Sequence, residues 1–288
     1  MTGIVSERYE MGRALGKGGA ASVFLATDLV QKCPVALKFF PPIGSSTPEF
    51  QREAAATLSL RHPGLIHLLD AGVHDGAPYL VLEYVEGEDL RTRIQAGPIP
   101  PAEALSWMIQ LFDALGALHR AGLVHGDIKP ENVILGADRL RLVDFGRARL
   151  GFRADGQGMF PGTAPYMHPD LFVGGSPSPE TDVFAAWVTT YELFGGQRPF
   201  TESTLRWSPT GQIPPFTPLL NAEYDKLVRP GIVGEYRTAR RSWVALSCFA
   251  MGRREALRVL PAAQSADPAR LRELRRRTLM RESIAVVG

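Results

Sequence analysis

The sequence predicts an α+β fold of two unequal parts, a small sheet-rich part followed by a larger helical part. Residues 9–84 hold short runs of β-branched and aromatic side chains separated by turn residues, a pattern typical of strands. Beyond residue 87 the apolar residues recur at the longer spacing of helices. With 288 residues, the chain is long enough for one large core or two modest ones. The two parts are expected to meet near residues 83–88.

In the sheet-rich part, one helix is expected among the strands. It should run from Thr47 to Leu60, because Thr47 can cap its first turn and Pro48 suits the first helical position. Strands are expected at Tyr9–Leu15, Ser22–Thr27, Pro34–Phe40, Leu65–Gly72 and Pro78–Tyr84.

In the larger part, the pattern predicts a long amphipathic helix over Pro101–Arg120 and a buried helix over Thr181–Phe194. The apolar stretch Trp243–Met251 is expected to be a further core helix, because it is too short to span a bilayer. Three short apolar runs between these helices are interpreted as buried strands: Ala121–Val124, Val133–Leu135 and Leu140–Val143.

Composition excludes several classes of protein. Apolar residues make up 45% of the chain, charged residues 22%, and the formal net charge is +2, so neither a nucleic-acid-binding surface nor a membrane segment is indicated. Cys33 and Cys248 lie too far apart to suggest a metal site. Met1–Tyr9 lacks the features of a secretory signal. A cytoplasmic location is therefore expected, with a secreted effector lacking a recognisable signal as the alternative.

One segment concentrates reactive side chains. Asp127, Lys129 and Asn132 fall within six residues, and Asp144 follows after a short apolar run. Asp127 and Asn132 are five residues apart, a spacing that a tight loop can bring to one metal cluster. Two carboxylates, an amide and a cation are the groups needed to accept a hydroxyl proton, hold metal ions and neutralise a phosphoryl group.

These residues resemble the catalytic loop and the metal-binding loop of the protein kinase family, in its serine/threonine branch. The resemblance runs from about Tyr9 to Phe200. It implies a two-lobed fold and a single kinase domain over residues 1–288, with an N-lobe over about 9–84, a hinge over about 83–88 and a C-lobe over about 89–288.

The resemblance also implies transfer of the γ-phosphoryl group of ATP to serine and threonine hydroxyls of proteins. Asp127 would accept the hydroxyl proton and Lys129 would neutralise the transferring group. Asn132 and Asp144 would hold Mg²⁺, with Mn²⁺ as the alternative. Thr163, in a segment that resembles the substrate-docking loop of kinases, would hydrogen-bond to Asp127 and Lys129.

The phosphate-binding residues are predicted in the sheet-rich part. Lys38 resembles the kinase lysine that contacts the phosphates, and Glu53 its ion-pair partner, with Glu49 as the fallback. The glycine-rich loop of the family would correspond to four residues: Gly16, Lys17, Gly18 and Gly19. On its own this loop is equally typical of a flexible hairpin, and Ala21 stands where the family carries its third glycine.

An adenine site is implied at the hinge. Leu82 occupies the gatekeeper position, and the backbone of Glu83 and Val85 would bond to adenine. The apolar walls would be Val23, Ala36 and Ile134. Asp89 lies where an acidic residue commonly meets the ribose, although a helix N-terminal carboxylate is an equally ordinary role for it.

Two further carboxylates are given structural roles by the resemblance. Asp182 resembles the buried aspartate that supports the catalytic loop from below. Asp170 replaces the glutamate that ends the docking loop, and Arg253 or Arg254 is its expected partner.

Gly126 stands where kinases that are switched on by activation-loop phosphorylation carry an arginine. That arginine normally pairs with the phosphate and orders the loop. Residues 147–162 also contain no serine, threonine or tyrosine. The arginine that would bind a loop phosphate and the hydroxyl that would carry it are both missing. The sequence therefore predicts a kinase that needs no activation-loop phosphate.

Two alternatives stay open, a small-molecule kinase of the aminoglycoside or choline type and a pseudokinase that acts as a binding module. His-Gly-Asp is common in the first group, whereas Lys129 and Thr163 favour protein substrates. Glu131 and Glu192, with Asp89, are expected to form an acidic rim that favours basic residues before the target hydroxyl.

Overall fold

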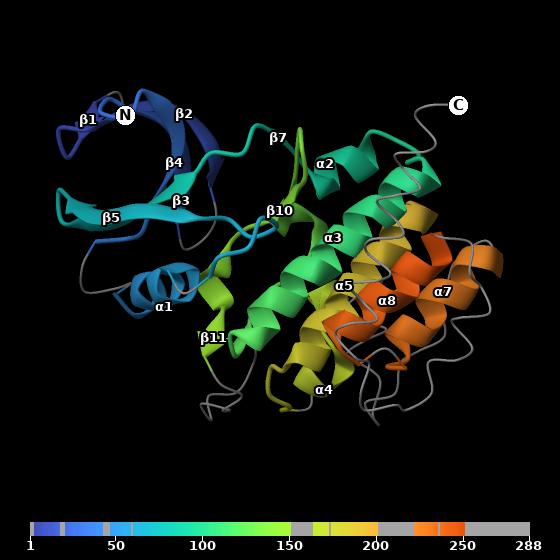
Figure 1. Cartoon of the computed structure of the whole chain (residues 1–288). Helices are drawn as coiled ribbons and strands as arrows, with labels where there is room; N and C mark the ends of the chain where they lie inside the picture. The colour runs from blue at the N-terminus through green and yellow to red at the C-terminus, as the bar shows by residue number, and fades with distance from the viewer. Residues whose placement is uncertain are drawn as a thin grey trace.

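The structure, a computed structural model, describes residues 3–17, 21–42, 47–58, 60–150, 164–172, 174–200, 222–235 and 237–250. These residues form a sheet-rich lobe and a helical lobe that lie side by side (Figure 1). The expected two-lobed α+β arrangement is confirmed. The arginine-rich segment 267–277, near the end of the sequence, lies outside the described residues.

The N-lobe is a six-stranded antiparallel sheet that curls on itself, with one helix beside it (Figure 1). Its strand order is β1-β2-β3-β4-β6-β5. The elements are β1 (Ile4–Val5), β2 (Tyr9–Lys17), β3 (Ser22–Asp28), β4 (Cys33–Phe39), α1 (Thr47–Leu58), β5 (Leu68–His74) and β6 (Ala77–Glu83).

The alternation of β4 places its side chains on two faces of the sheet. Val35 and Leu37 pack into a small core with Tyr9 and Tyr79. Ala36 belongs to the main core that continues into the C-lobe. Lys38 is two residues from Ala36 and therefore lies on the same face of β4. The lysine is buried on the side of the sheet that faces α1 and the C-lobe.

Several predicted boundaries of the N-lobe were wrong by one to three residues. Helix α1 ends at Leu58, before the predicted Leu60. The strand predicted to begin at Leu65 begins at Leu68, because the preceding residues pair elsewhere. Leu65 forms a parallel bridge with Leu142, and the Ile66 N–H donates to the Leu142 carbonyl at 3.0 Å. This segment therefore ties the lobes together instead of extending the sheet.

The connection between the lobes follows β6 and is short. It leads into β7 (Gly87–Asp89), which joins β9 (Val133–Gly136) and β10 (Leu140–Leu142) in a sheet of order β10-β9-β7. A Cβ on Gly87 would lie 2.0 Å from the carbonyl oxygen of Leu135, so only glycine fits at this crossing.

The C-lobe is built around two long helices. One matches its predicted range, and the other begins two residues earlier and ends one residue later than predicted. Helix α3 (Pro101–Arg120) has Pro101 at its first position, and α5 (Pro179–Gly195) begins with a capping box between Ser178 and Thr181. Smaller elements complete the lobe: α2 (Leu90–Gln95), β8 (Leu123–Val124), η1 (Pro130–Asn132), η2 (Phe145–Arg147), β11 (Arg149–Leu150), η3 (Ala164–Tyr166), α4 (Pro169–Phe172), α7 (Ala222–Ile232) and α8 (Ala239–Ala250).

Helix α5 is enclosed by its neighbours, which explains its largely apolar sequence. The Trp187 indole donates to the Ser242 hydroxyl at 2.9 Å, and Gly231 packs directly against the same indole ring. Helices α7 and α8 therefore dock on α5 through one large aromatic side chain.

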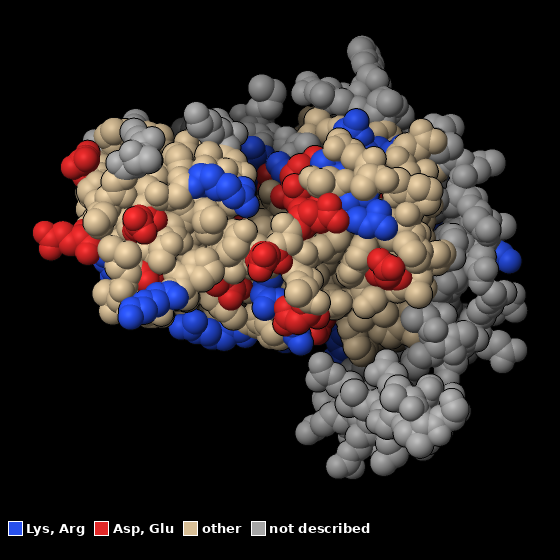
Figure 2. All heavy atoms as spheres, turned by 90° about the horizontal axis from the view of Figure 1, so that it is seen from above, with Lys and Arg blue, Asp and Glu red and all other residues tan. Residues whose placement is uncertain are grey.

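The visible surface carries charges of both signs. Figure 2 shows basic and acidic side chains interspersed over one face, without a broad field of one sign. Among the described residues, no helix is both long and apolar enough to cross a membrane.

Candidate active site

The segment that carries Asp127 is held by the backbone and by one buried carboxylate. Asp182, at the start of α5, is 1% exposed. Its carboxylate accepts the N–H of His125 at 2.8 Å and the N–H of Gly126 at 2.9 Å. It also lies 2.9 Å from Nε2 of His119 on α3. The support that the sequence predicted for Asp182 is present in the structure.

Gly126 adopts a left-handed backbone conformation, with φ +76°. A side chain at this position would meet the steric penalty that L-residues carry there. Glycine at this position therefore avoids backbone strain next to Asp127.

We expect Gly126→Ala to lower the free energy of unfolding by about 1 kcal/mol, because alanine pays for the positive φ. Chemical denaturation of the purified protein measures this change. Gly116→Ala on α3 is the matched control. It should not lower the free energy of unfolding, since helical backbone favours alanine over glycine. An unchanged stability in Gly126→Ala would show that the loop relaxes without strain.

Asp127 is buried, and cations flank its carboxylate. Lys129 Nζ lies 2.8 Å from Oδ2, and Arg147 Nη1 lies 3.6 Å from Oδ1. The amide of Asn132 donates to the Asp127 backbone carbonyl at 2.7 Å. The loop therefore gathers a carboxylate, an ammonium and an amide at one point, as the sequence predicted.

Lys38 connects the N-lobe to the metal-binding segment. Its ammonium lies 2.7 Å from Oε1 of Glu53 on α1 and 2.7 Å from Oδ1 of Asp144. Burial disfavours the charged ammonium, but Glu53 and Asp144 outweigh it and raise the pKa of Lys38. Glu53, the first choice of the sequence analysis, is in contact with Lys38 and is 1% exposed.

Asp144 is the residue that precedes η2, with φ +66°. The surrounding protein partly desolvates its carboxyl, which opposes the charge although 47% of the side chain is exposed, but the Lys38 ammonium outweighs this and lowers the pKa to about 2. Asp144 is therefore ionised at neutral pH and is a hard oxygen ligand. A Cβ on Gly146 would lie 3.2 Å from both Asp144 Oδ1 and Glu53 Oε2, so this glycine leaves room for the charged cluster.

The donor set fits a phosphate-bound divalent cation. Because the Asn132 nitrogen points at the Asp127 carbonyl, its amide oxygen is the atom available as a ligand, alongside the Asp144 carboxylate. Within the described part of the chain, no cluster of three or more His, Cys, Asp or Glu side chains could hold a metal ion. Two protein oxygens completed by phosphate and water are the arrangement typical of Mg²⁺.

The predicted apolar walls line the strands beside the hinge. Ala36 is paired with Leu82 across β4 and β6, and both are largely buried. Val23, Val85 and Ile134 are half-buried, and the two valines pack against the main core.

At the hinge, the Glu83 N–H donates to the His67 carbonyl at 3.0 Å, so this N–H is already occupied within the protein. Asp89 caps α2: its carboxylate accepts the Thr92 N–H at 2.8 Å and the Thr92 hydroxyl at 3.0 Å. The helix N-terminal role weighed for Asp89 is therefore present in the structure.

Several predicted residues fall at the edge of the described chain. Gly16 and Lys17 end β2, where they pair with Val23 and Ser22. Gly18, Gly19 and Thr163 lie outside the described residues, and so do Arg253 and Arg254. Asp170 lies 3.5 Å from the Nδ1 atom of His168.

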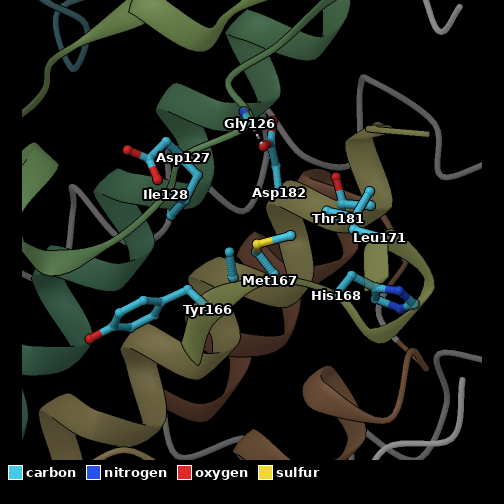
Figure 3. A pocket seen from close by; sticks show the side chains of 10 residues that line it. Gly126, Asp127, Ile128, Tyr166, Met167, His168, Leu171, Thr181 and Asp182 are labelled. Carbon is cyan, nitrogen blue, oxygen red and sulfur yellow. Dashed lines mark hydrogen bonds between the residues drawn. The ribbon is translucent and has the colours of Figure 1, made fainter. Parts of the chain in front are cut away.

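A small hollow of about 20 Å³ lies beside Asp127 (Figure 3). Gly126, Asp127 and Ile128 line one side, and Tyr166–His168 of the docking segment line the other. Burial lowers the pKa of His168, which favours its neutral form.

One residue of the site was missed by the sequence analysis. Arg91, on α2, contacts Glu131 of η1, Glu192 of α5 and the hydroxyl of Tyr166. Glu192 is 4% exposed, so it is an internal group and not part of an open rim. The expectation that Glu192 forms an acidic rim with Glu131 was therefore wrong, because Arg91 lies between them.

Comparisons with known proteins agree with this geometry. A family model described as protein kinase domain matches residues 9–217. The chain is 33% identical over 230 residues to serine/threonine-protein kinase PrkC of Bacillus subtilis, which covers 72% of this chain and 36% of PrkC. It is 34% identical over 206 residues to serine/threonine-protein kinase PknL of Mycobacterium tuberculosis, covering 69% of this chain and 52% of PknL. The chain thus spans about a third to a half of these curated relatives.

Proposed function

Because the chain belongs to the protein kinase family, we propose that it is an ATP-dependent serine/threonine protein kinase. The observation that carries this proposal is the position of Lys38, 2.7 Å from both Glu53 and Asp144. This contact joins the phosphate-binding lysine of one lobe to the metal-binding carboxylate of the other, which is the assembled arrangement of an active kinase.

The residues would act in the following way. Asp127 orients the acceptor hydroxyl and takes its proton, and Lys129 neutralises charge on the transferring group. Asn132 and Asp144 would hold the divalent cation, Mg²⁺ in preference to Mn²⁺, against the phosphates. Bound ATP would supply the γ-phosphoryl group. Lys38 would bind the α- and β-phosphates, and the Glu53 ion pair keeps its ammonium in position.

The base would be held by the apolar walls at the hinge. Ala36 and Leu82, neighbours across β4 and β6, would pack against the base, and the backbone of Glu83 and Val85 would bond to adenine. We further propose that residues beyond the family match belong to the same domain, because α7 and α8 pack on α5 and α3. ATP supply makes the cytoplasm the proposed location.

Transfer of radiolabelled γ-phosphate from ATP to a generic protein tests the proposal. The wild type should label serine and threonine, and Asp127→Asn should reduce labelling by about 10²- to 10⁴-fold, since it removes the proton acceptor while keeping the side-chain shape. Label on small hydroxyl compounds alone would identify a small-molecule kinase. ATP binding with equal labelling by wild type and variant would identify a binding module.

We also propose that activity does not need activation-loop phosphorylation. Gly126 offers no arginine for a loop phosphate, and residues 147–162 offer no hydroxyl to carry one. Arg147 lies 3.6 Å from the Asp127 carboxylate and supplies a cation from the start of the same segment.

Phosphatase-treated protein should therefore keep its full rate of transfer. Arg147→Gln should lower that rate about tenfold, because the cation beside Asp127 is lost. Initial rates before and after phosphatase treatment, with mass-spectrometric mapping, check both points. Loss of activity together with a phosphosite between residues 147 and 162 would contradict the proposal.

A further inference from the structure

Arg91 stands at the point where four elements of the C-lobe meet. Its Nε lies 2.8 Å from Oε1 of Glu131, and its Nη1 lies 2.6 Å from Oε1 of Glu192. Its Nη2 also contacts the hydroxyl of Tyr166. Helix α2, the catalytic loop, the docking segment and α5 are therefore joined by one guanidinium group.

The buried carboxylate of Glu192 explains why a cation is needed here. With 5% of its side chain exposed, Glu192 would be costly as an unpaired charge. The Tyr166 hydroxyl donates to Oε2 at 2.5 Å, and Arg91 supplies the positive charge. Burial opposes the charged guanidinium, but its bonds to Glu192 and Glu131 outweigh it and raise the pKa of Arg91.

This network is joined to the loop that carries Asp127, the carboxylate that an acceptor hydroxyl must reach. Glu131 follows Asp127 by four residues in the same loop, and its side chain is 43% exposed. Tyr166 belongs to the segment that lines the hollow beside Asp127 (Figure 3). In that view the Tyr166 hydroxyl points away from the hollow, which agrees with its bonds to the buried network.

We propose that Arg91 is a specificity-determining residue that fills, from within the chain, the place a basic side chain of a substrate would take. The carboxylates of Glu131 and Glu192 are already paired by Arg91, so an arginine or lysine on the substrate would gain little from them. The favoured substrates are therefore proteins with neutral residues around the acceptor hydroxyl. This inference rests on the proposed kinase activity.

A positional peptide library tests it. The wild type should show no more than about a twofold preference for arginine at any position near the acceptor, because surface charge pairs contribute little. Arg91→Leu should gain about a tenfold preference for arginine at one position, since a buried carboxylate then accepts a charge-assisted bond from the peptide. A gain of this kind is not expected from a residue with only a structural role.

Two controls separate charge from folding. Arg93→Leu, on the same helix, should leave the wild-type pattern unchanged, since Arg93 donates to the Gly97 carbonyl at 3.3 Å and not to Glu192. The double variant Arg91→Leu, Glu192→Gln removes both charges, so it should fold at least as well as Arg91→Leu and lose the acquired preference. Melting temperatures confirm that each variant is folded.

A strong arginine preference in the wild type would overturn the inference. So would a folded Arg91→Leu variant whose residue preferences in the peptide library match those of the wild type. The wild-type library alone decides the first, so the test does not depend on any variant folding. If the wild type labelled no peptide or protein at all, the proposed kinase activity would fail instead, and the two failures are thus distinguishable.

Discussion

Lys38→Met is expected to lower phosphoryl transfer by at least about hundredfold, because removing a preorganised charge from a transferring group costs this much in comparable sites. The same change should lower the free energy of unfolding by about 3 kcal/mol, since it leaves the buried carboxylate of Glu53 without its cation. Initial rates at saturating ATP and chemical denaturation measure the two effects separately.

The double variant Lys38→Met, Glu53→Met separates these two roles of the lysine. Both charges are then removed from the buried pair, so most of the lost stability should return. The rate should stay low, because no ammonium remains beside the phosphates. If the double variant regained activity, Lys38 would act only as a packing partner and the assignment of its role would be wrong.

Asp182→Ala is expected to lower both the free energy of unfolding and the rate of phosphoryl transfer. Its carboxylate accepts two backbone N–H groups and lies against His119, all within a buried region. Removing it leaves two buried donors unsatisfied, at about 1–3 kcal/mol each, so we expect a loss near 3 kcal/mol. A lobe of this size would melt roughly 6–12 °C lower. The rate should fall as well, because Asp127 follows the two supported residues directly.

Thr189→Val is the matched control for Asp182→Ala. Thr189 is also buried on α5, but its hydroxyl donates to the Ala185 carbonyl of its own helix at 2.9 Å. Its loss should cost under about 1 kcal/mol and leave the rate unchanged. Equal effects of the two substitutions would mean that α5 responds to any polar deletion and that Asp182 has no special part in the loop.

Much of the fold follows from local patterns in the sequence. The apolar run of β4 and the apolar spacing of α3 predicted those elements within a residue or two, because β4 is buried on both faces and α3 buries one face in the main core. The strand predicted from Leu65 failed for a physical reason. Leu65 and Ile66 have the apolar character of a sheet strand, yet they pair with Leu142 of the other lobe. Pattern alone does not reveal the partner of an extended segment.

Some residues of the candidate site could likewise be predicted from the sequence, and others could not. Lys38, Asp127 and Asn132 could be placed from the sequence because they occur in ordered motifs. The network of Arg91 could not, because its contacts span 40, 75 and 101 residues along the chain. Glu192 looked like an exposed charge on a helix, but α5 is enclosed on nearly every side. Only the packing of four elements shows that this carboxylate is internal.

Phosphosite mapping of a protein substrate tests the central claim most directly. The substrate is incubated with ATP and Mg²⁺ and either the wild type or Asp127→Asn, and its peptides are analysed by mass spectrometry. The account predicts phosphate on serine and threonine with the wild type and a loss of at least about hundredfold with the variant. Phosphate on neither residue with a folded, ATP-binding wild type, or equal phosphorylation by both proteins, would contradict it.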